Sequence, residues 1–303
     1  MTITASIQQT DTQSENLSLG NQRQEKRLLK VALIDLYNGE ANLGIQAIKD
    51  LVSHWSKHAN GVSLSLQQFE TRKLGDIPDT EFDIYISSGG PGSPFDGEGS
   101  AWEATYFKWV DKIWRHNQSA AVSNGNLAPK HVLFICHSFQ MMCRHFQLGE
   151  VTRRRSQSFG VLKAFQSEAG KSDPLFDNLQ DPFYVADFRD WQVIQPNEAV
   201  IQELGATILA HEKIRPHVDL ERAIMGIRLS KEMVGVQFHP EADPAGMLVH
   251  FQKTARRENI IKEHGEKKFN QIISRLKDPE FLLHTYERVI PNFLQNAVSA
   301  SQS

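Results

Sequence analysis

The chain has 303 residues, of which 40% are hydrophobic and 23% are charged, and its formal net charge is −3. This composition is typical of a soluble globular protein with one large domain or two small ones. The small negative charge gives no general attraction for nucleic acid or acidic membranes, and no apolar run approaches the roughly 20 residues that span a bilayer. We therefore expect neither nucleic acid nor membrane as a partner.

The first 27 residues are rich in Ser, Thr, Gln and Asn and predict a disordered lead-in without the apolar core of a secretory signal. The two cysteines of the chain, Cys136 and Cys143, are separated by roughly 10 Å if they share a helix, which is too far for a disulfide. Reduced thiols and the lack of an export signal predict a cytoplasmic location.

Strands and helices alternate through the first half of the chain. The expected strands cover 28–36, 62–69, 82–88 and 131–135, and the expected helices cover 43–55, 101–116 and the residues after the last of these strands. Each strand is apolar on both faces, which is typical of a parallel sheet covered by helices on both sides. The pattern predicts a three-layer α/β fold with a mostly parallel, flavodoxin-like central sheet.

The second half of the chain has a different pattern. Short strands dominate from Gly160 to Phe238, including the segment 232–238, and we expect an antiparallel extension of the same domain. After Ala245 the sequence becomes helical and highly charged, with Asp278-Pro279 typical of a helix start and Pro291 typical of a break. The expected organisation is a lead-in at 1–27, one domain at 28–250 and a helical C-terminal extension at 251–303.

Cys136 follows the apolar strand at 131–135 and begins a helix. Unpaired N–H groups and the positive end of the helix dipole at such a position favour a nucleophilic thiolate. A buried core cysteine is an equally good interpretation of this segment alone.

The segment VGVQFHPEAD at 234–243 carries the second candidate group, His239 followed by Glu241. Residues two apart in an extended chain point the same way, so the carboxylate can reach the imidazole ring and fix its tautomer. The other ring nitrogen is then free to act as a base. Taken alone, an exposed histidine beside a solvated glutamate explains the segment equally well.

The third segment, SSGGPGSPFDGEG at 87–99, follows a strand and is rich in glycine. Glycines allow backbone N–H groups to face a ligand, although an ordinary loop has the same composition. The segment lacks the lysine and the glycine spacing of the nucleotide-binding fingerprints. Together the three segments supply a Cys–His–Glu triad and an oxyanion loop, which are the parts needed for thiol-mediated acyl transfer.

The segments GGPGSP, FICHSFQMM and GVQFHPE, in this order, resemble those of class I glutamine amidotransferases, the triad-type glutaminases, and are similar to the glutaminase part of GMP synthase. The resemblance spans residues 30–250. It implies Cys136 as nucleophile, His239 as general base and acid, and Glu241 as orienting carboxylate. It also implies backbone N–H donors to the oxyanion at Gly90 and His137. The substrate-binding residues that it suggests are Gln140, Gly92, Arg189 and Asp190.

The residues around the nucleophile depart from the family pattern, in which the neighbours are small. Phe134 and Ser138 stand at the flanking positions that are glycine in the family, and Phe139 precedes Gln140 where the family has His, Tyr or Met. Ser138 is small enough for a tight turn, whereas Phe134 is large. We therefore expect a reshaped site that accepts a substrate other than free glutamine or that needs a partner to order it.

The resemblance implies an enzyme that cleaves the side-chain amide of glutamine through a thioester and releases ammonia. The segment after Ala245 is too short for an ATP-using synthetase domain, so an acceptor on a separate partner subunit is expected. The alternatives are a stand-alone hydrolase of γ-glutamyl compounds and a catalytically silent binding or regulatory protein. No cofactor is expected, and no metal, because the histidines lack a ligand-like arrangement. The RRR run at 153–155 predicts an exposed basic face, with an anion-binding role as the alternative.

Overall fold

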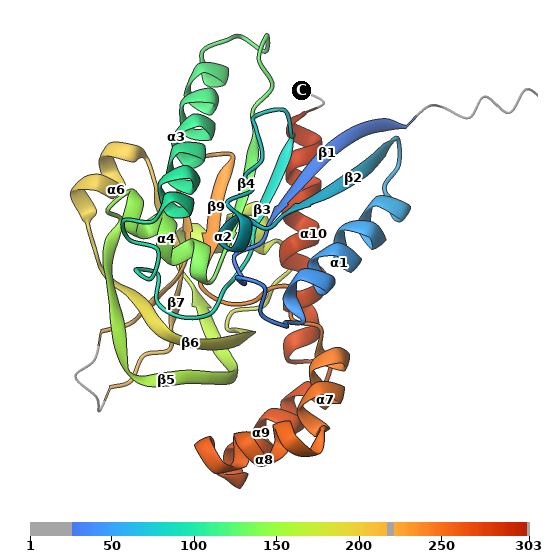
Figure 1. Ribbon diagram of the computed structural model, residues 1–303, viewed down its shortest axis with the longest axis vertical. Helices are drawn as coiled ribbons and strands as arrows, with labels where there is room; N and C mark the ends of the chain where they lie inside the picture. The colour runs from blue at the N-terminus through green and yellow to red at the C-terminus, as the bar shows by residue number, and fades with distance from the viewer. Residues whose placement is uncertain (1–25, 217–220, 302–303) are drawn as a thin grey trace, which may run out of the picture.

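A computed structural model describes residues 26–216 and 221–301 (Figure 1). Residues 1–25 of the predicted lead-in therefore lie outside the described residues. One nine-stranded sheet runs through this part of the chain, in the order β2-β1-β3-β4-β9-β8-β7-β5-β6. The strands are β1 (Arg27–Ile34), β2 (Val62–Phe69), β3 (Ile84–Ser87), β4 (His131–Ile135), β5 (Gly149–Gln166), β6 (Phe183–Pro196), β7 (Thr207–Glu212), β8 (Ile224–Arg228) and β9 (Met233–Val236). The five strands from β2 to β9 are parallel and the other four are antiparallel, which confirms the predicted α/β class.

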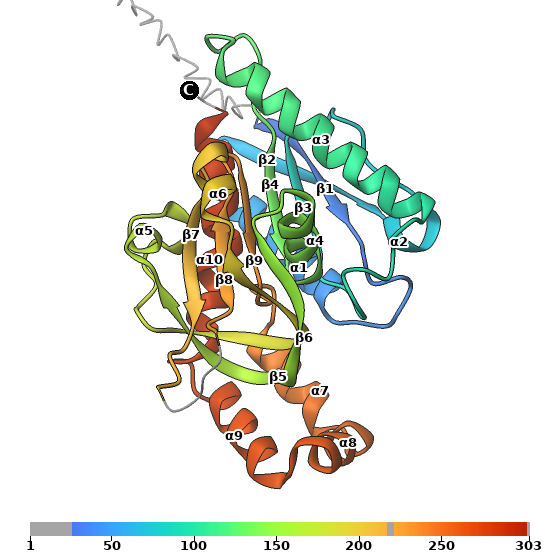
Figure 2. The same cartoon turned by 90° about the vertical axis from the view of Figure 1, so that its left-hand side faces the viewer.

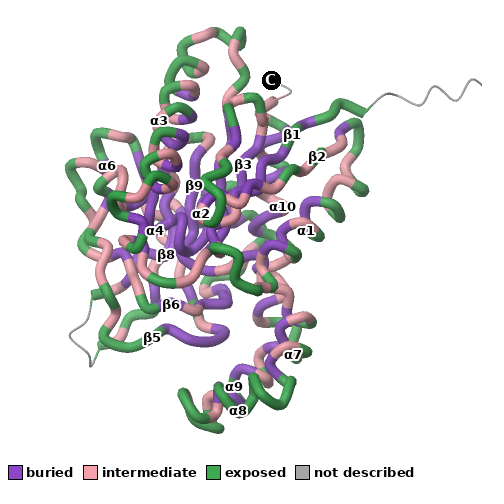
Figure 3. The backbone as a smooth tube through the Cα atoms, in the orientation of Figure 1, coloured by how far each residue is buried: buried purple, intermediate pink, exposed green. Residues whose placement is uncertain are grey.

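Helices cover both faces of the sheet and extend beyond one of its ends (Figures 1 and 2). They are α1 (Gly44–His58), α2 (Thr71–Leu74), α3 (Ala101–Ala121), α4 (His137–His145), α5 (Glu168–Lys171), α6 (Glu198–Leu204), α7 (Pro244–Gln252), α8 (Thr254–His264), α9 (Glu266–Lys277) and α10 (Leu282–Ala300), with a 3-10 turn at Pro174–Phe176. Apolar residues of α1 and α10 form one core with the sheet, and those of α3 and α4 form a second core on its other face. The central strands between these cores are buried (Figure 3).

The pairing of β9 differs from the sequence prediction, which placed it in the antiparallel extension. β9 pairs in parallel with β4, with Ile135 opposite Val236. All four of its residues are buried, as expected for a strand covered by helices on both faces. The parallel pairing brings the carboxyl ends of β4 and β9 together, and with them the two segments that carry Cys136 and His239. In open parallel sheets, ligands bind at such strand ends.

The predicted break at Pro291 is wrong, because α10 continues through this residue. A proline inside a helix removes one backbone hydrogen bond and crowds the preceding turn. Its neighbours Ile290, Phe293 and Leu294 are buried against the sheet, so tertiary packing holds the helix together. The Asp278-Pro279 pair lies in the turn before α10 and not at its first residue. Among the described residues, no helix is long and apolar enough to cross a membrane.

Candidate active site

Cys136 occupies the sharp turn between β4 and α4. Its backbone has φ 50° and ψ −96°, in a region that side-chain-bearing residues rarely adopt. Its N–H donates a hydrogen bond to the Val236 carbonyl at 2.8 Å, which fastens the turn to β9. The thiol is therefore held at the N-terminus of α4 and is free of any disulfide.

His239 and Glu241 meet beside this turn. The His239 Nδ1 and the Glu241 Oε1 are 2.8 Å apart. The His239 N–H donates to the Ala186 carbonyl at 3.0 Å, which anchors the segment on β6. The Glu241 side chain is buried, and its Oε2 has no hydrogen-bond partner among the described residues. Among the described residues, the imidazole of His239 is therefore the one hydrogen-bond partner of this carboxylate.

The charges of the neighbouring groups set the protonation of His239. Burial alone lowers the pKa of the ring, but the charges of Cys136 and Glu241, together with their hydrogen bonds to it, raise this pKa well above its usual value. The ring therefore interacts with both the thiol and the carboxylate, and their charges favour its protonated form.

The backbone amides of Gly90, in the glycine-rich loop, and of His137, directly after Cys136, have no acceptor in the part of the chain that the structure describes. A Cβ at Gly90 would lie 2.5 Å from the Leu36 carbonyl oxygen, so only glycine fits at this turn. The imidazole of His137 is buried, and burial together with Arg72 and Arg144 lowers its pKa to about 3. It is therefore neutral at pH 7, and the backbone N–H is the group of this residue that can stabilise an oxyanion.

Two arginines that the sequence analysis did not select, Arg72 and Arg144, hold the glycine-rich loop. The Arg72 Nη1 donates to the Pro91 carbonyl at 2.6 Å, and its Nη2 lies 3.4 Å from the Asp96 carboxylate. The Arg144 Nη1 donates to the Pro94 carbonyl at 2.5 Å. These contacts from α2 and α4 fix the loop on both sides of Gly92. No local sequence motif marks these two arginines, so their contacts with the loop became apparent only in the folded structure.

Gln140 contacts a second glutamine that the sequence analysis did not select. The Gln140 Nε2 donates to the Gln237 Oε1 and to the Trp191 carbonyl, both at 3.2 Å. The Gln237 Nε2 in turn lies 3.8 Å from the Cys136 Sγ. Gln237 immediately follows β9 and lies two residues before His239 in the sequence. Its position near Cys136 therefore follows from the pairing of β9 with β4.

The other residues suggested as substrate contacts lie elsewhere. Arg189 is buried in an ion pair with Asp187, with Nε and Oδ1 2.8 Å apart. Asp190 is exposed, and its carboxylate accepts a hydrogen bond from Gln157 at 3.5 Å. Gly92 has φ +80°, and a Cβ there would lie 2.3 Å from an Asp96 carboxylate oxygen, so this glycine permits a tight loop turn. None of the three lines the cavity to which His239 and Glu241 belong.

This cavity has a volume of about 570 Å³. Its lining includes Tyr37, Gly90, His239 and Glu241, as well as residues at the start of α1. The C-terminal helices and β6 supply further lining residues, of which the apolar ones are Phe188, Met247, Phe251 and Tyr286. Cys136 is 5% exposed and is not among the residues that line this cavity.

Tyr37 also lines this cavity, and the sequence analysis did not select it. Its Oη lies 2.7 Å from the position that a Cβ would take on Gly44 and 3.3 Å from that on Gly89. Burial raises the pKa of this phenol, and the charges of Glu241 and Cys136 raise it further. The neutral hydroxyl is therefore wedged between two glycines beside the triad.

The unusual neighbours of the nucleophile do not face the cavity. Phe134 and Phe139 are fully buried in the core between the sheet and α3. Gly235 lies opposite Phe134 on β9, and a Cβ there would lie 2.8 Å from the Phe139 ring. The glycine on the neighbouring strand therefore makes room for both aromatic rings. The Ser138 hydroxyl donates to the Ser87 carbonyl at 2.7 Å and thereby joins the turn to β3.

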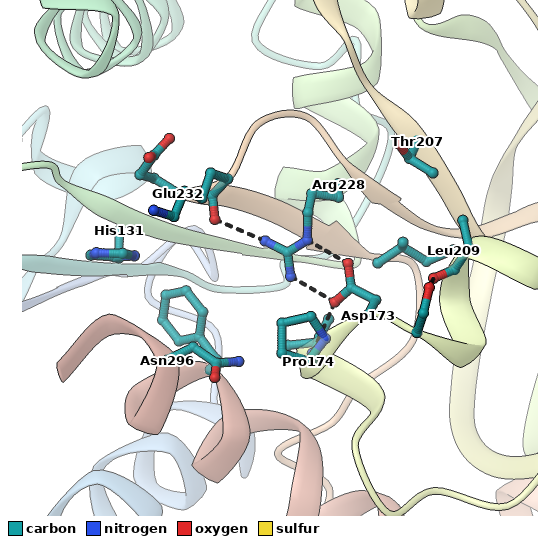
Figure 4. A pocket seen from close by; sticks show the side chains of 13 residues that line it. His131, Asp173, Pro174, Thr207, Leu209, Arg228, Glu232 and Asn296 are labelled. Atoms are coloured by element: carbon teal, nitrogen blue, oxygen red, sulfur yellow. Dashed lines mark hydrogen bonds and ion pairs between the residues drawn. The ribbon is translucent and has the colours of Figure 1, made fainter. Parts of the chain in front are cut away.

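A second cavity, of about 350 Å³, lies at the opposite end of β4 (Figure 4). His131 begins this strand, and the cavity also contains the Arg228–Asp173 ion pair, with Nη2 and Oδ1 2.8 Å apart. Arg228 also donates to the Lys231 carbonyl at 3.2 Å. Burial, together with the charges of Lys231 and Arg228, lowers the pKa of His131 to about 4. No cysteine lines this cavity, so it offers no thiol nucleophile.

Comparison with known proteins places the chain in a family. A family profile described as class-I glutamine amidotransferase matches residues 45–253, which is more than half of the chain. No curated protein sequence gave a significant match.

Solved structures share the fold. A glutamine amidotransferase from Thermotoga maritima has a TM-score of 0.63 and 17% identity over 89% of this chain and 98% of that chain. One from Methylobacillus flagellatus has a TM-score of 0.55 and 13% identity over 90% and 96%. A protein from Thermoplasma acidophilum that is described as part of a GMP synthase has a TM-score of 0.53 and 16% identity over 92% and 98%. At these identities the likeness establishes the fold alone.

Proposed function

Because the chain belongs to the class-I glutamine amidotransferase family, we propose that it is a cysteine-dependent glutaminase that supplies ammonia to an acceptor on a partner subunit. The observation that carries this proposal is the hydrogen bond of His239 to Glu241, together with the electrostatic interaction of the same ring with Cys136. The backbone amides of Gly90 and His137 have no acceptors among the described residues and are the proposed donors to the oxyanion. Nucleophile, base, orienting carboxylate and oxyanion donors are the complete set for acyl transfer.

In the proposed reaction the Cys136 thiolate attacks the side-chain amide carbon of glutamine, and the amides of Gly90 and His137 donate to the developing oxyanion. The imidazolium of His239 gives its proton to the amide nitrogen as the C–N bond breaks, so ammonia leaves and a γ-glutamyl thioester remains. His239, now neutral, takes a proton from water, which attacks the thioester. Glutamate is released and the thiolate is restored. Glu241 keeps the ring oriented through both steps.

Release of ammonia and glutamate from glutamine tests this proposal. We expect the wild-type protein to produce both in equal amounts and Cys136→Ala to produce neither. Cys143→Ala is the matched control, because Cys143 is a buried free thiol in the core and away from the cavity. Turnover that survives Cys136→Ala, or that is lost equally in Cys143→Ala, would contradict the proposed role of the nucleophile.

The cavity favours a second candidate function, hydrolysis of γ-glutamyl compounds without a partner. Its volume of about 570 Å³ lies in the range of roughly 300–1,000 Å³ that holds drug-sized ligands, whereas ammonia needs almost none of it. Phe188 and Phe251 pack edge to face in its wall, with ring centroids 6.0 Å apart. An apolar wall of this kind suits a substrate whose amine carries an apolar group.

The two functions differ in their preferred leaving group. A glutaminase should turn over glutamine faster than γ-glutamyl anilide, with a kcat/KM ratio of about tenfold or more, because bulky amines gain nothing in the reaction. A γ-glutamyl hydrolase should show the opposite preference, and Met247→Gln, which adds a polar group to the apolar wall, should reduce anilide turnover more than glutamine turnover.

A further inference from the structure

A third cavity, of about 260 Å³, lies between the β5–β6 hairpin, the end of β7 and helix α9. Most of the charged side chains that line it are cationic. They are Arg154, Lys163, Lys213, Arg215, Lys268 and Arg275, against the two carboxylates Asp187 and Glu212. The cations come from segments that are distant in sequence, so the fold gathers them around one space.

Both carboxylates are already paired. Glu212 accepts hydrogen bonds from Arg154 at 3.0 and 3.1 Å, and it also pairs with Arg215. Asp187 pairs with the buried Arg189 at 2.8 Å and accepts from the Ser158 hydroxyl at 2.6 Å. Each carboxylate is therefore engaged by at least one arginine, and the lining as a whole keeps an excess of positive charge.

Two lysines of the lining, Lys213 and Lys268, have neither a hydrogen bond nor an ion pair to any other described residue. Lys268 is partly buried, and its pKa is lowered by burial and by the charges of Arg275 and Lys213. Like charges gathered in a partly desolvated space are unfavourable unless an anion joins them.

We propose that this cavity binds a small phosphate-bearing anion, with Lys213 and Lys268 as its unpaired ligands. Phosphate oxygens accept several charge-assisted hydrogen bonds at once, as a ring of ammonium and guanidinium groups requires. The volume of about 260 Å³ suits a small molecule better than an extended polymer. Within the RRR run, Arg153 and Arg155 are exposed as predicted, whereas the Arg154 side chain is 6% exposed and belongs to this cavity.

The proposed anion site is separated from the catalytic cavity by one layer of aromatic rings. Phe159 lines the anion site and packs on Phe188, with centroids 5.0 Å apart. Phe188 lines the catalytic cavity. Lys268 and Arg275 belong to α9, so a bound anion would also join the C-terminal extension to the sheet.

Isothermal titration calorimetry of the full chain at low ionic strength tests the proposal, with inorganic phosphate and ribose 5-phosphate as probes. We expect one saturable site per chain, and affinity at least about tenfold weaker in the double variant Lys213→Gln/Lys268→Gln, because two charge-assisted hydrogen bonds are lost. Tighter binding of the sugar phosphate would indicate a phosphorylated metabolite, and equal binding would indicate free phosphate.

The matched control is Lys262→Gln/Lys267→Gln, which removes the same charge from exposed positions on α8 and α9 outside the cavity. Its affinity should stay within about twofold of the wild type. No saturable binding by the wild-type chain, or equal weakening in both double variants, would overturn the proposal, since a general attraction of basic surfaces for anions would then explain the data.

Discussion

His239 is the residue on which the proposed chemistry depends most, because its protonation is set by its neighbours. The thiol of Cys136 and the carboxylate of Glu241 raise its pKa against the effect of burial. The active form in the proposed mechanism is therefore a thiolate paired with an imidazolium. Activity should fall at high pH, where the ring loses its proton.

Glu241→Gln tests this electrostatic account. The amide can still accept a hydrogen bond from the ring, but the negative charge that raises the pKa of His239 is gone, so this pKa must fall. We expect the alkaline limb of the profile of kcat/KM against pH to move to lower pH, and kcat to fall by about 10²-fold or more. An alkaline limb that stays in place would show that Glu241 does not set the protonation of the ring.

The glycine-rich loop depends on contacts from two separate helices. Arg72→Met removes the hydrogen bond to the Pro91 carbonyl and the contact with Asp96, so the adjacent Gly90 amide should lose its fixed position. We expect kcat/KM for glutamine to fall by about 10- to 100-fold. Lys73→Met is the control, because Lys73 makes one exposed ion pair, with Glu70. Equal activities of the two variants would contradict a role of Arg72 in positioning the loop.

The pairing of β4 with β9 makes a specific prediction for stability. Gly235→Ala places a Cβ 2.8 Å from the Phe139 ring in a tightly packed core, and we expect a loss of about 1–3 kcal/mol in the free energy of unfolding.

Gly226→Ala is the control for Gly235→Ala, because the nearest atom to its Cβ is 3.5 Å away, an ordinary contact. Urea denaturation should show this variant within about 0.5 kcal/mol of the wild type. A Gly235→Ala protein as stable as this control would show that the glycine is not needed to make room for the aromatic rings.

For the whole molecule, the C-terminal helices should differ in local stability. Eight residues of α10 are buried, whereas Ile260 is the one buried residue among the described residues of α8. Hydrogen exchange should therefore protect the amides of α10 nearly as strongly as those of β4, and those of α8 much less. Equal exchange of α8 and α10 would contradict the inference that α10 unfolds together with the sheet.

Local patterns predicted the first four strands well, and they selected Cys136, His239 and Glu241 as candidates, because apolar periodicity and a short motif are properties of neighbouring positions. They could not show that β9 lies beside β4, since parallel pairing joins segments that are far apart in the chain. For the same reason the roles of Gln237, Arg72 and Gly235 emerged from the fold. The prediction at Pro291 was wrong because buried contacts outweigh the intrinsic tendency of proline to end a helix.

The central claim is that Cys136 is the nucleophile of an amidase, and covalent labelling by a diazoketone analogue of glutamine tests it most directly. Peptide mass spectrometry should find one adduct per chain on Cys136, none on Cys143, and protection by excess glutamine. Glu241→Gln should be labelled more slowly, since the charge that raises the pKa of His239 is gone. An unlabelled Cys136, or equal labelling of both cysteines, would contradict the account.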